Sequence, residues 1–140
     1  MSETTELIIT LPGKRRVDAA FGHHVVHTDQ PVDNGGDDGA PSPFQLFLAS
    51  IGTCAGIFVQ GFCAKRSLDP SGIRIVERPS YDEQGTLKDV SLSVELPGDF
   101  PEKYREALLR VVEQCSVKKA IAAQPTFTVR AVGGALAPAA

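Results

Sequence analysis

Hydrophobic side chains fall at every second position in several short segments of this chain, the pattern of a β-strand with one buried face. In residues 88–96, Val90, Leu92 and Val94 would share one face, and the residues between them are polar or charged. Turn-forming residues such as Pro12-Gly13 and Gly22 separate these segments. Strands are therefore predicted at residues 5–11, 17–21, 23–28, 73–77, 88–96 and 126–132, with a loop at 31–39.

One long segment carries no charge, because Asp, Glu, Lys and Arg are absent between Asp38 and Lys65. Ser42 suits an N-cap and Pro43 the first helical position, so a helix is predicted from residue 43 to about residue 66. A charge-free helix of this length in a soluble protein needs cover on nearly all sides. We therefore expect a second subunit to help cover it, with the Gly52–Gly56 patch as a crossing point of two helices.

Two shorter helices are predicted beyond residue 97. The first begins at 99–102, where a proline and acidic residues favour a helix start, and ends at Cys115. Ser116 is expected to cap a third helix that runs through Ile121. The order of strands, helix, strands, helix and strand predicts an α+β fold with a mostly antiparallel sheet, in one domain spanning residues 1–140.

Composition and charge argue against several functions. The net charge of −3 and the lack of Trp leave no basic surface for nucleic acid and no patch for anionic lipid. Residues 43–63 are long enough to cross a membrane, but polar residues and three glycines dilute the run, which favours a buried helix. The N-terminus shows no signal-peptide pattern and the cysteine count is odd, which predicts a cytoplasmic protein with reduced thiols.

No metal or cofactor site is predicted. His23 and His27 would lie about 13 Å apart on one strand face, with His24 on the other, so one ion cannot reach all three. The acidic residues of loop 31–39 lack the ligand spacing of a calcium loop. No nucleotide fingerprint occurs in the sequence.

The three cysteines are the candidate chemical groups. Cys54 and Cys63 lie nine positions apart on the long helix, which separates them by about 13 Å along the axis and rules out a disulfide. Cys63, beside Phe62, is interpreted as a core residue. Cys54 and Cys115 remain, and from their spacing alone they are either two unrelated buried residues or a redox pair.

A reactive Cys54 would need help to ionise. It lies about three turns into its helix, beyond the reach of the helix dipole, and burial raises the pKa of a thiol. A cation is therefore expected from elsewhere, and Lys14, Arg15 and Arg16 are the local supply, unless they form only a solvated turn. Cys115 precedes a new helix, whose backbone N–H groups are expected to assist it as a resolving thiol.

Two motifs together resemble the OsmC/Ohr superfamily: SPFQLFLASIGTC from Ser42 to Cys54, and Cys115-Ser116-Val117. The resemblance implies an OsmC-like intertwined homodimer, with antiparallel sheet packed on long central helices. It also implies reduction of organic hydroperoxides, with Cys54 as the peroxidatic thiolate, Cys115 as the resolving thiol and a dithiol such as a lipoylated protein as reductant. Arg16 would activate the thiolate, with Arg15 as the second choice.

The sequence departs from the hydroperoxide reductases just after the helix-opening proline. Those proteins carry a glutamate there that holds the arginine, whereas this chain has Phe44 followed by Gln45. The Ser-Pro opening and the Cys-Ser-Val motif look more like the divergent OsmC-like branch. Two other functions stay open: a dimer that binds a small hydrophobic ligand without catalysis, and a redox sensor that forms a Cys54–Cys115 disulfide.

Overall fold

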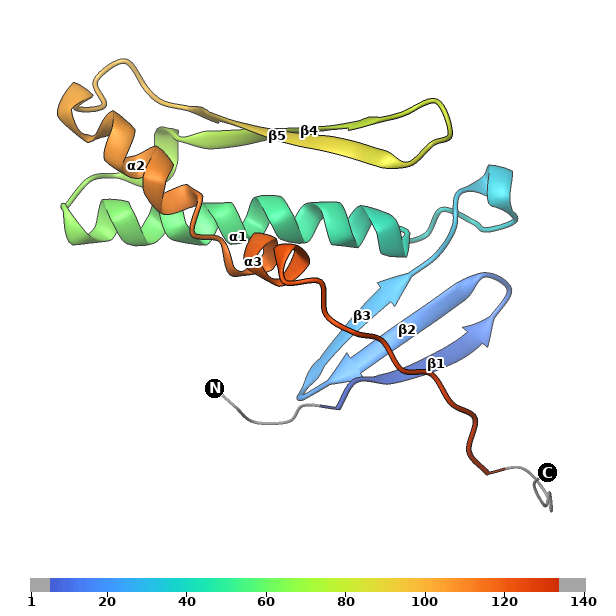
Figure 1. The fold of residues 1–140 in the computed structure, drawn as a ribbon. Helices are drawn as coiled ribbons and strands as arrows, with labels where there is room; N and C mark the ends of the chain where they lie inside the picture. The colour runs from blue at the N-terminus through green and yellow to red at the C-terminus, as the bar shows by residue number, and fades with distance from the viewer. Residues whose placement is uncertain (1–5, 134–140) are drawn as a thin grey trace.

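The computed structural model describes residues 6–133 and contains two antiparallel sheets and three α-helices (Figure 1). The first sheet has the order β1-β2-β3, and the second is the hairpin β4-β5. Three single 3₁₀ turns occur at residues Val32–Asn34, Pro70–Gly72 and Glu102–Tyr104. The strands and helices are β1 (Ile8–Gly13), β2 (Arg16–Phe21), β3 (His24–Thr28), α1 (Pro43–Lys65), β4 (Arg74–Tyr81), β5 (Leu87–Glu95), α2 (Arg105–Val112) and α3 (Ser116–Ala122).

The long helix α1 begins where the sequence predicts. The Ser42 hydroxyl accepts a hydrogen bond from the Gln45 amide N–H, and the Gln45 side chain accepts one from the Ser42 N–H at 2.9 Å. This capping box satisfies two backbone donors that a helix start otherwise leaves without partners. Pro43 takes the first helical position, where a missing N–H is harmless.

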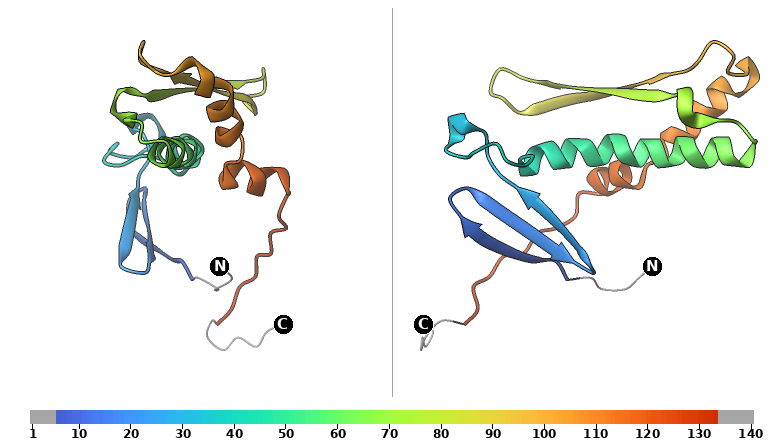
Figure 2. Two further views of the ribbon diagram at one scale, coloured as in Figure 1. Left: turned by 90° about the vertical axis from the view of Figure 1, so that its left-hand side faces the viewer. Right: turned by 180° about the vertical axis from the view of Figure 1, so that it is seen from behind.

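The hydrophobic core lies on one face of α1, between this helix, the β4-β5 hairpin and α2 (Figure 2). Its buried residues from α1 are spaced at helical intervals, and Leu108 and Val112 from α2 complete it. The predicted inward face of β5 is confirmed, because Leu92 and Val94 pack against this cluster. Among the described helices, α1 alone has the length and hydropathy to cross a membrane. In this structure, apolar residues on one face of α1 form part of the hydrophobic core.

The opposite face of α1 is open in a single chain. Ile57 is 66% exposed there, and Thr53 and Gln60 are exposed beside it. The β1-β2-β3 sheet lies on the other side of α1 from β4-β5, and β1 is exposed along its whole length (Figure 1). Neither sheet reaches this outer face, so a single chain leaves it open, and the expected cover by a second subunit stays a prediction.

The Gly52–Gly56 patch on α1 differs from the prediction in part. A Cβ at Gly52 would come within 2.5 Å of the Glu77 carboxylate, so at this position the absent side chain makes room for β4 of the same chain. Nothing lies within 4 Å of the corresponding point at Gly56. Only Gly56 remains available as a point of close approach to another helix.

Three predictions from the sequence are corrected. Residues 126–132 form no strand, and Phe127 and Val129 are 87% and 94% exposed, because no strand within residues 6–133 offers them backbone partners. The first turn lies at Lys14-Arg15 rather than at Pro12-Gly13, which belong to β1. The second helix, which was predicted to end at Cys115, ends at Val112. The first predicted strand begins at residue 5, which lies outside the described residues.

Candidate active site

Cys54 lies half-buried in the middle of α1, on the side that meets the start of α3. Its Sγ atom is 3.7 Å from the Ser116 hydroxyl oxygen. Cys115 is fully buried immediately before Ser116 and occupies the N-cap position of α3. Ser116 is therefore the first residue of the helix and not its cap, and its hydroxyl faces a thiol instead of the helix backbone.

The packing of α2 on α1 explains why these two distant segments meet. Leu108, Val112 and Cys115 recur at helical spacing, and all three are buried. The Cys115 N–H donates to the Val112 carbonyl at 3.3 Å, which continues the α2 turn up to the point where α3 starts. The same apolar contact that holds α2 on the long helix thus delivers residues 115–117 to Cys54.

Hydrogen bonds from this segment lower the pKa of Cys54 to about 7. The Cys115 side chain contributes most, the Val117 backbone N–H comes next, and the hydroxyl and N–H of Ser116 add to them against an opposing effect of burial. Donors aimed at a sulfur favour its charged form, because they stabilise the negative charge that ionisation creates. At neutral pH a large fraction of Cys54 is therefore thiolate, with a second thiol beside it.

The predicted cation is not part of this arrangement within one chain. Arg16 is exposed at the start of β2, and the strand register that pairs Val17 with Thr28 places Arg16 across from Asp29. Its charge contributes to the lowered pKa of Asp29, behind the backbone N–H groups of Gly39, Gln30 and Asp37. Neither Arg16 nor Arg15 is among the groups that shift the pKa of Cys54.

The start of α1 supplies no acid in place of the family glutamate. Phe44 is 47% exposed and its ring lies 5.4 Å from that of Phe47 and 6.4 Å from that of Tyr81, measured between centroids. Gln45 is committed to the capping box with Ser42. The residues at this position therefore have structural tasks, and any partner for an arginine has to come from elsewhere.

Cys63 has a different environment. It is fully buried in the core cluster beside Phe62, and burial raises the pKa of its thiol. The interpretation of Cys63 as a core residue is confirmed. All three cysteines are free in the structure.

One partly buried acid beside α1 was not singled out from the sequence. The Glu77 carboxylate, on β4, presses against Gly52, and its Oε2 atom is inaccessible to solvent and has no hydrogen-bond partner among residues 6–133. Burial raises the pKa of this carboxyl. In sequence Glu77 is an unremarkable member of an alternating strand, so only the tertiary structure reveals it. Within the described part of the chain, no group of three or more His, Cys, Asp or Glu side chains could hold a metal ion.

Solved structures with the same fold come from several bacteria. A Psychrobacter arcticus protein named for osmotic stress induction and detoxification has a TM-score of 0.72 at 20% identity, covering 86% of this chain and 90% of its own. An OsmC-like protein of Mycoplasma pneumoniae reaches 0.69 at 12% identity, covering 89% and 91%. The organic hydroperoxide resistance protein OhrB of Bacillus subtilis reaches 0.54 at 20% identity, covering 87% and 93%.

At these identities the likeness establishes the fold, an α+β arrangement with antiparallel sheets. A search of curated protein sequences gave no match. A sequence profile described as OsmC-like protein matches residues 35–130, a span that includes both Cys54 and Cys115. The chain belongs to the OsmC-like protein family.

Proposed function

We propose that this protein is a thiol-dependent peroxidase that reduces organic hydroperoxides through Cys54 and Cys115. The observation that carries the proposal is the lowered pKa of Cys54, which arises mainly from the buried thiol of Cys115 next to it. A nucleophile that is ionised near neutral pH and a second thiol within hydrogen-bonding reach are the two requirements of a two-cysteine peroxidase. The names of family members associated with hydroperoxide resistance support the same reaction class.

The first step oxidises Cys54. Its thiolate attacks the terminal oxygen of the hydroperoxide, so an S–O bond forms while the O–O bond breaks. The alkoxide that leaves takes up a proton and departs as an alcohol, and Cys54 becomes a sulfenic acid. The Ser116 hydroxyl and the N–H groups of residues 116 and 117 hold the attacking sulfur in place until then.

The second step forms a disulfide and then removes it. The Cys115 sulfur attacks the sulfenic sulfur of Cys54, an S–S bond forms, and hydroxide leaves and is protonated to water. An external dithiol, such as a lipoylated protein, supplies two electrons and two protons that restore both thiols. Such a cycle suits the reducing cytoplasm, where we place the protein.

We further propose that the working form is a homodimer. The exposed outer face of α1, the exposed apolar side chains of β1 and the unpaired segment 126–132 all favour burial against a second copy. Because Arg16 does not act on Cys54 of its own chain, its proposed role as activating cation requires that it reach Cys54 of the second copy.

The test is a turnover assay with cumene hydroperoxide and dihydrolipoamide, with Cys115→Ser beside the wild type. With excess dihydrolipoamide the wild type should consume many equivalents, and Cys115→Ser should turn over much more slowly, because dihydrolipoamide must then attack the Cys54 sulfenic acid instead of a disulfide. A protein that forms the disulfide once and does not turn over would be a redox sensor. A protein that takes up cumene alcohol equally well with or without Cys54, and never reduces peroxide, would be a ligand-binding dimer.

A further inference from the structure

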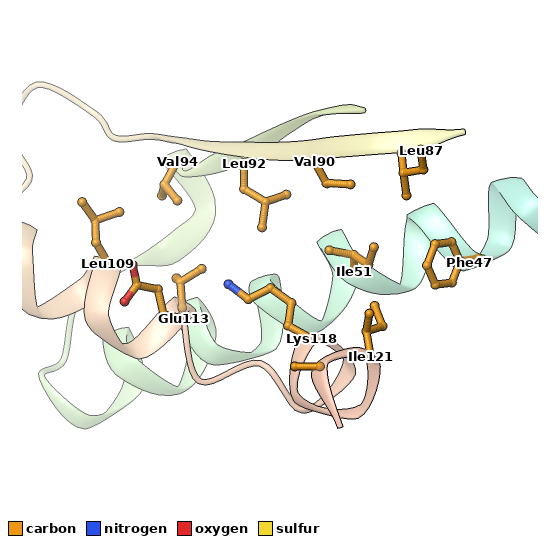
Figure 3. A pocket seen from close by; sticks show the side chains of 12 residues that line it. Phe47, Ile51, Leu87, Val90, Leu92, Val94, Leu109, Glu113, Lys118 and Ile121 are labelled. Atoms are coloured by element: carbon orange, nitrogen blue, oxygen red, sulfur yellow. The ribbon is translucent and has the colours of Figure 1, made fainter. Parts of the chain in front are cut away.

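A cavity of about 460 Å³ lies between β5 and the three helices (Figure 3). All but two of the residues that line it are aliphatic or aromatic, and they come from four elements. This volume falls within the range of about 300–1,000 Å³ that is typical of small-molecule sites. The residues that define it best are Phe47, Ile51, Val90, Leu92, Leu109 and Ile121.

Only two charged side chains line this cavity, Glu113 and Lys118. Lys118 is half-buried, and its amine extends into the space between β5 and α1 (Figure 3). The Glu113 carboxylate is exposed and turns toward Leu109, away from that amine (Figure 3). Within residues 6–133, the Lys118 amine forms no side-chain ion pair or hydrogen bond.

We propose that this cavity binds a small amphipathic carboxylate, with its aliphatic chain among the apolar walls and its carboxylate on Lys118. The Lys118 ammonium group has no anionic partner among residues 6–133, so a ligand anion in the cavity can pair with it through a charge-assisted hydrogen bond. The aliphatic walls gain free energy with each methylene that they remove from water. A ligand with one anionic end and an apolar tail satisfies both requirements at once.

The cavity does not include the proposed nucleophile, because Cys54 is not among the residues that line it. It adjoins the thiol, since Ile51 lies three residues before Cys54 on α1 and Lys118 lies two residues after Ser116 on α3. Binding of a carboxylate in this cavity does not require the peroxidase activity, so the two proposals can fail independently.

Calorimetric titration of the full chain with straight-chain carboxylates from hexanoate to decanoate tests the apolar part of the site. We expect saturable binding that strengthens about fourfold with each added methylene until the cavity is full. Ala122→Phe, at an exposed position on the cavity wall, should weaken decanoate without unfolding the protein. Circular dichroism checks the fold of each variant.

The charged part is tested with Lys118→Met and its neighbour Lys119→Met, which removes an equal charge outside the cavity. Lys118→Met should weaken decanoate by about tenfold or more and leave 1-decanol unchanged, since only the former needs the ammonium group. Lys119→Met should bind both as the wild type does. The proposal is overturned if decanoate shows no saturable binding, if 1-decanol binds as well as decanoate, or if both lysine variants respond alike. Preference for decyltrimethylammonium would also overturn it and assign the head-group contact to Glu113.

Discussion

Cys54 and Cys63 share one helix and lie nine residues apart, yet the protein treats them in opposite ways. Around Cys63 the neighbours are apolar, the sulfur is fully buried, and its pKa rises because the charged form loses solvation. Around Cys54 the neighbours include a thiol, a hydroxyl and two backbone N–H groups, and its pKa falls. The difference lies in what packs against the helix: a hydrophobic cluster in one case, and the first turn of another helix in the other.

The largest expected contrast is in turnover. Cys54→Ser should reduce peroxide consumption with dihydrolipoamide to the background rate, because a serine hydroxyl is not ionised at neutral pH and cannot attack the peroxide. Cys63→Ser should retain most of the activity in a folded protein. Initial rates with cumene hydroperoxide measure both, and equal losses in the two variants would contradict the proposed division of roles.

The next contrast is in thiol reactivity. Alkylation of native protein by iodoacetamide, followed by mass spectrometry of peptides, should modify Cys54 with a pH midpoint near 7. Cys63 should react only when the protein unfolds, because it is fully buried. A Cys54 midpoint near 8.5, the value of a free thiol, would show that the hydrogen-bond donors do not act on it.

Stability should differ between the two ends of the helix. Phe62→Ala, beside Cys63 and only 3% exposed, should lower the free energy of unfolding by about 3–5 kcal/mol because it leaves a cavity. Phe44→Ala, at the half-exposed start of α1, is the matched control and should cost under about 1 kcal/mol. Urea denaturation followed by circular dichroism provides the comparison. Similar losses in the free energy of unfolding at both positions would contradict the placement of the core around Phe62.

A smaller effect should follow loss of a single donor. Ser116→Ala removes the hydroxyl 3.7 Å from Cys54 Sγ, so the alkylation midpoint should rise by less than about one pH unit. Ser50→Ala is the control, because the Ser50 hydroxyl donates to the Phe47 carbonyl within α1. If both variants shift the midpoint equally, the contact with Ser116 is not the cause.

The smallest effects are opposite pH slopes of stability. Cys54 is ionised in the folded protein at a lower pH than in the unfolded chain, so its contribution to stability is present above about 8.5 and is lost as the pH falls toward 7. Cys63 stays protonated when folded, so its presence lowers stability as the pH rises above about 8.5. Denaturation of each Cys→Ala variant across this range measures the two slopes, and slopes of the same sign would be inconsistent with these shifts.

Local sequence signals were enough for most of the secondary structure. The capping residues before α1, the alternation in β5 and the glycine between β2 and β3 depend only on neighbours along the chain, and each produced the expected element. Segment 126–132 has the same alternation but no strand. Strand formation requires a partner edge, and no pattern within the segment says whether the partner belongs to the same chain.

The candidate site was predictable only in part, because it is assembled by tertiary packing. Helix geometry separated Cys54 from Cys63, whereas the pairing of Cys54 with Cys115 came from the family resemblance. The N–H groups at the start of α3 were expected to assist Cys115, but they act on Cys54. The position of α3 against α1 decides this, and it follows from the burial of Leu108 and Val112 rather than from any feature of the Cys-Ser-Val motif itself.

Three thiols can pair in three ways, and the two pairings that involve Cys63 would give a non-native disulfide. By enclosing Cys63 in the core, the fold leaves one pairing that can form without partial unfolding. In the proposed cycle, repeated oxidation and reduction would then produce no non-native disulfide, and no enzyme would be needed to rearrange the bonds.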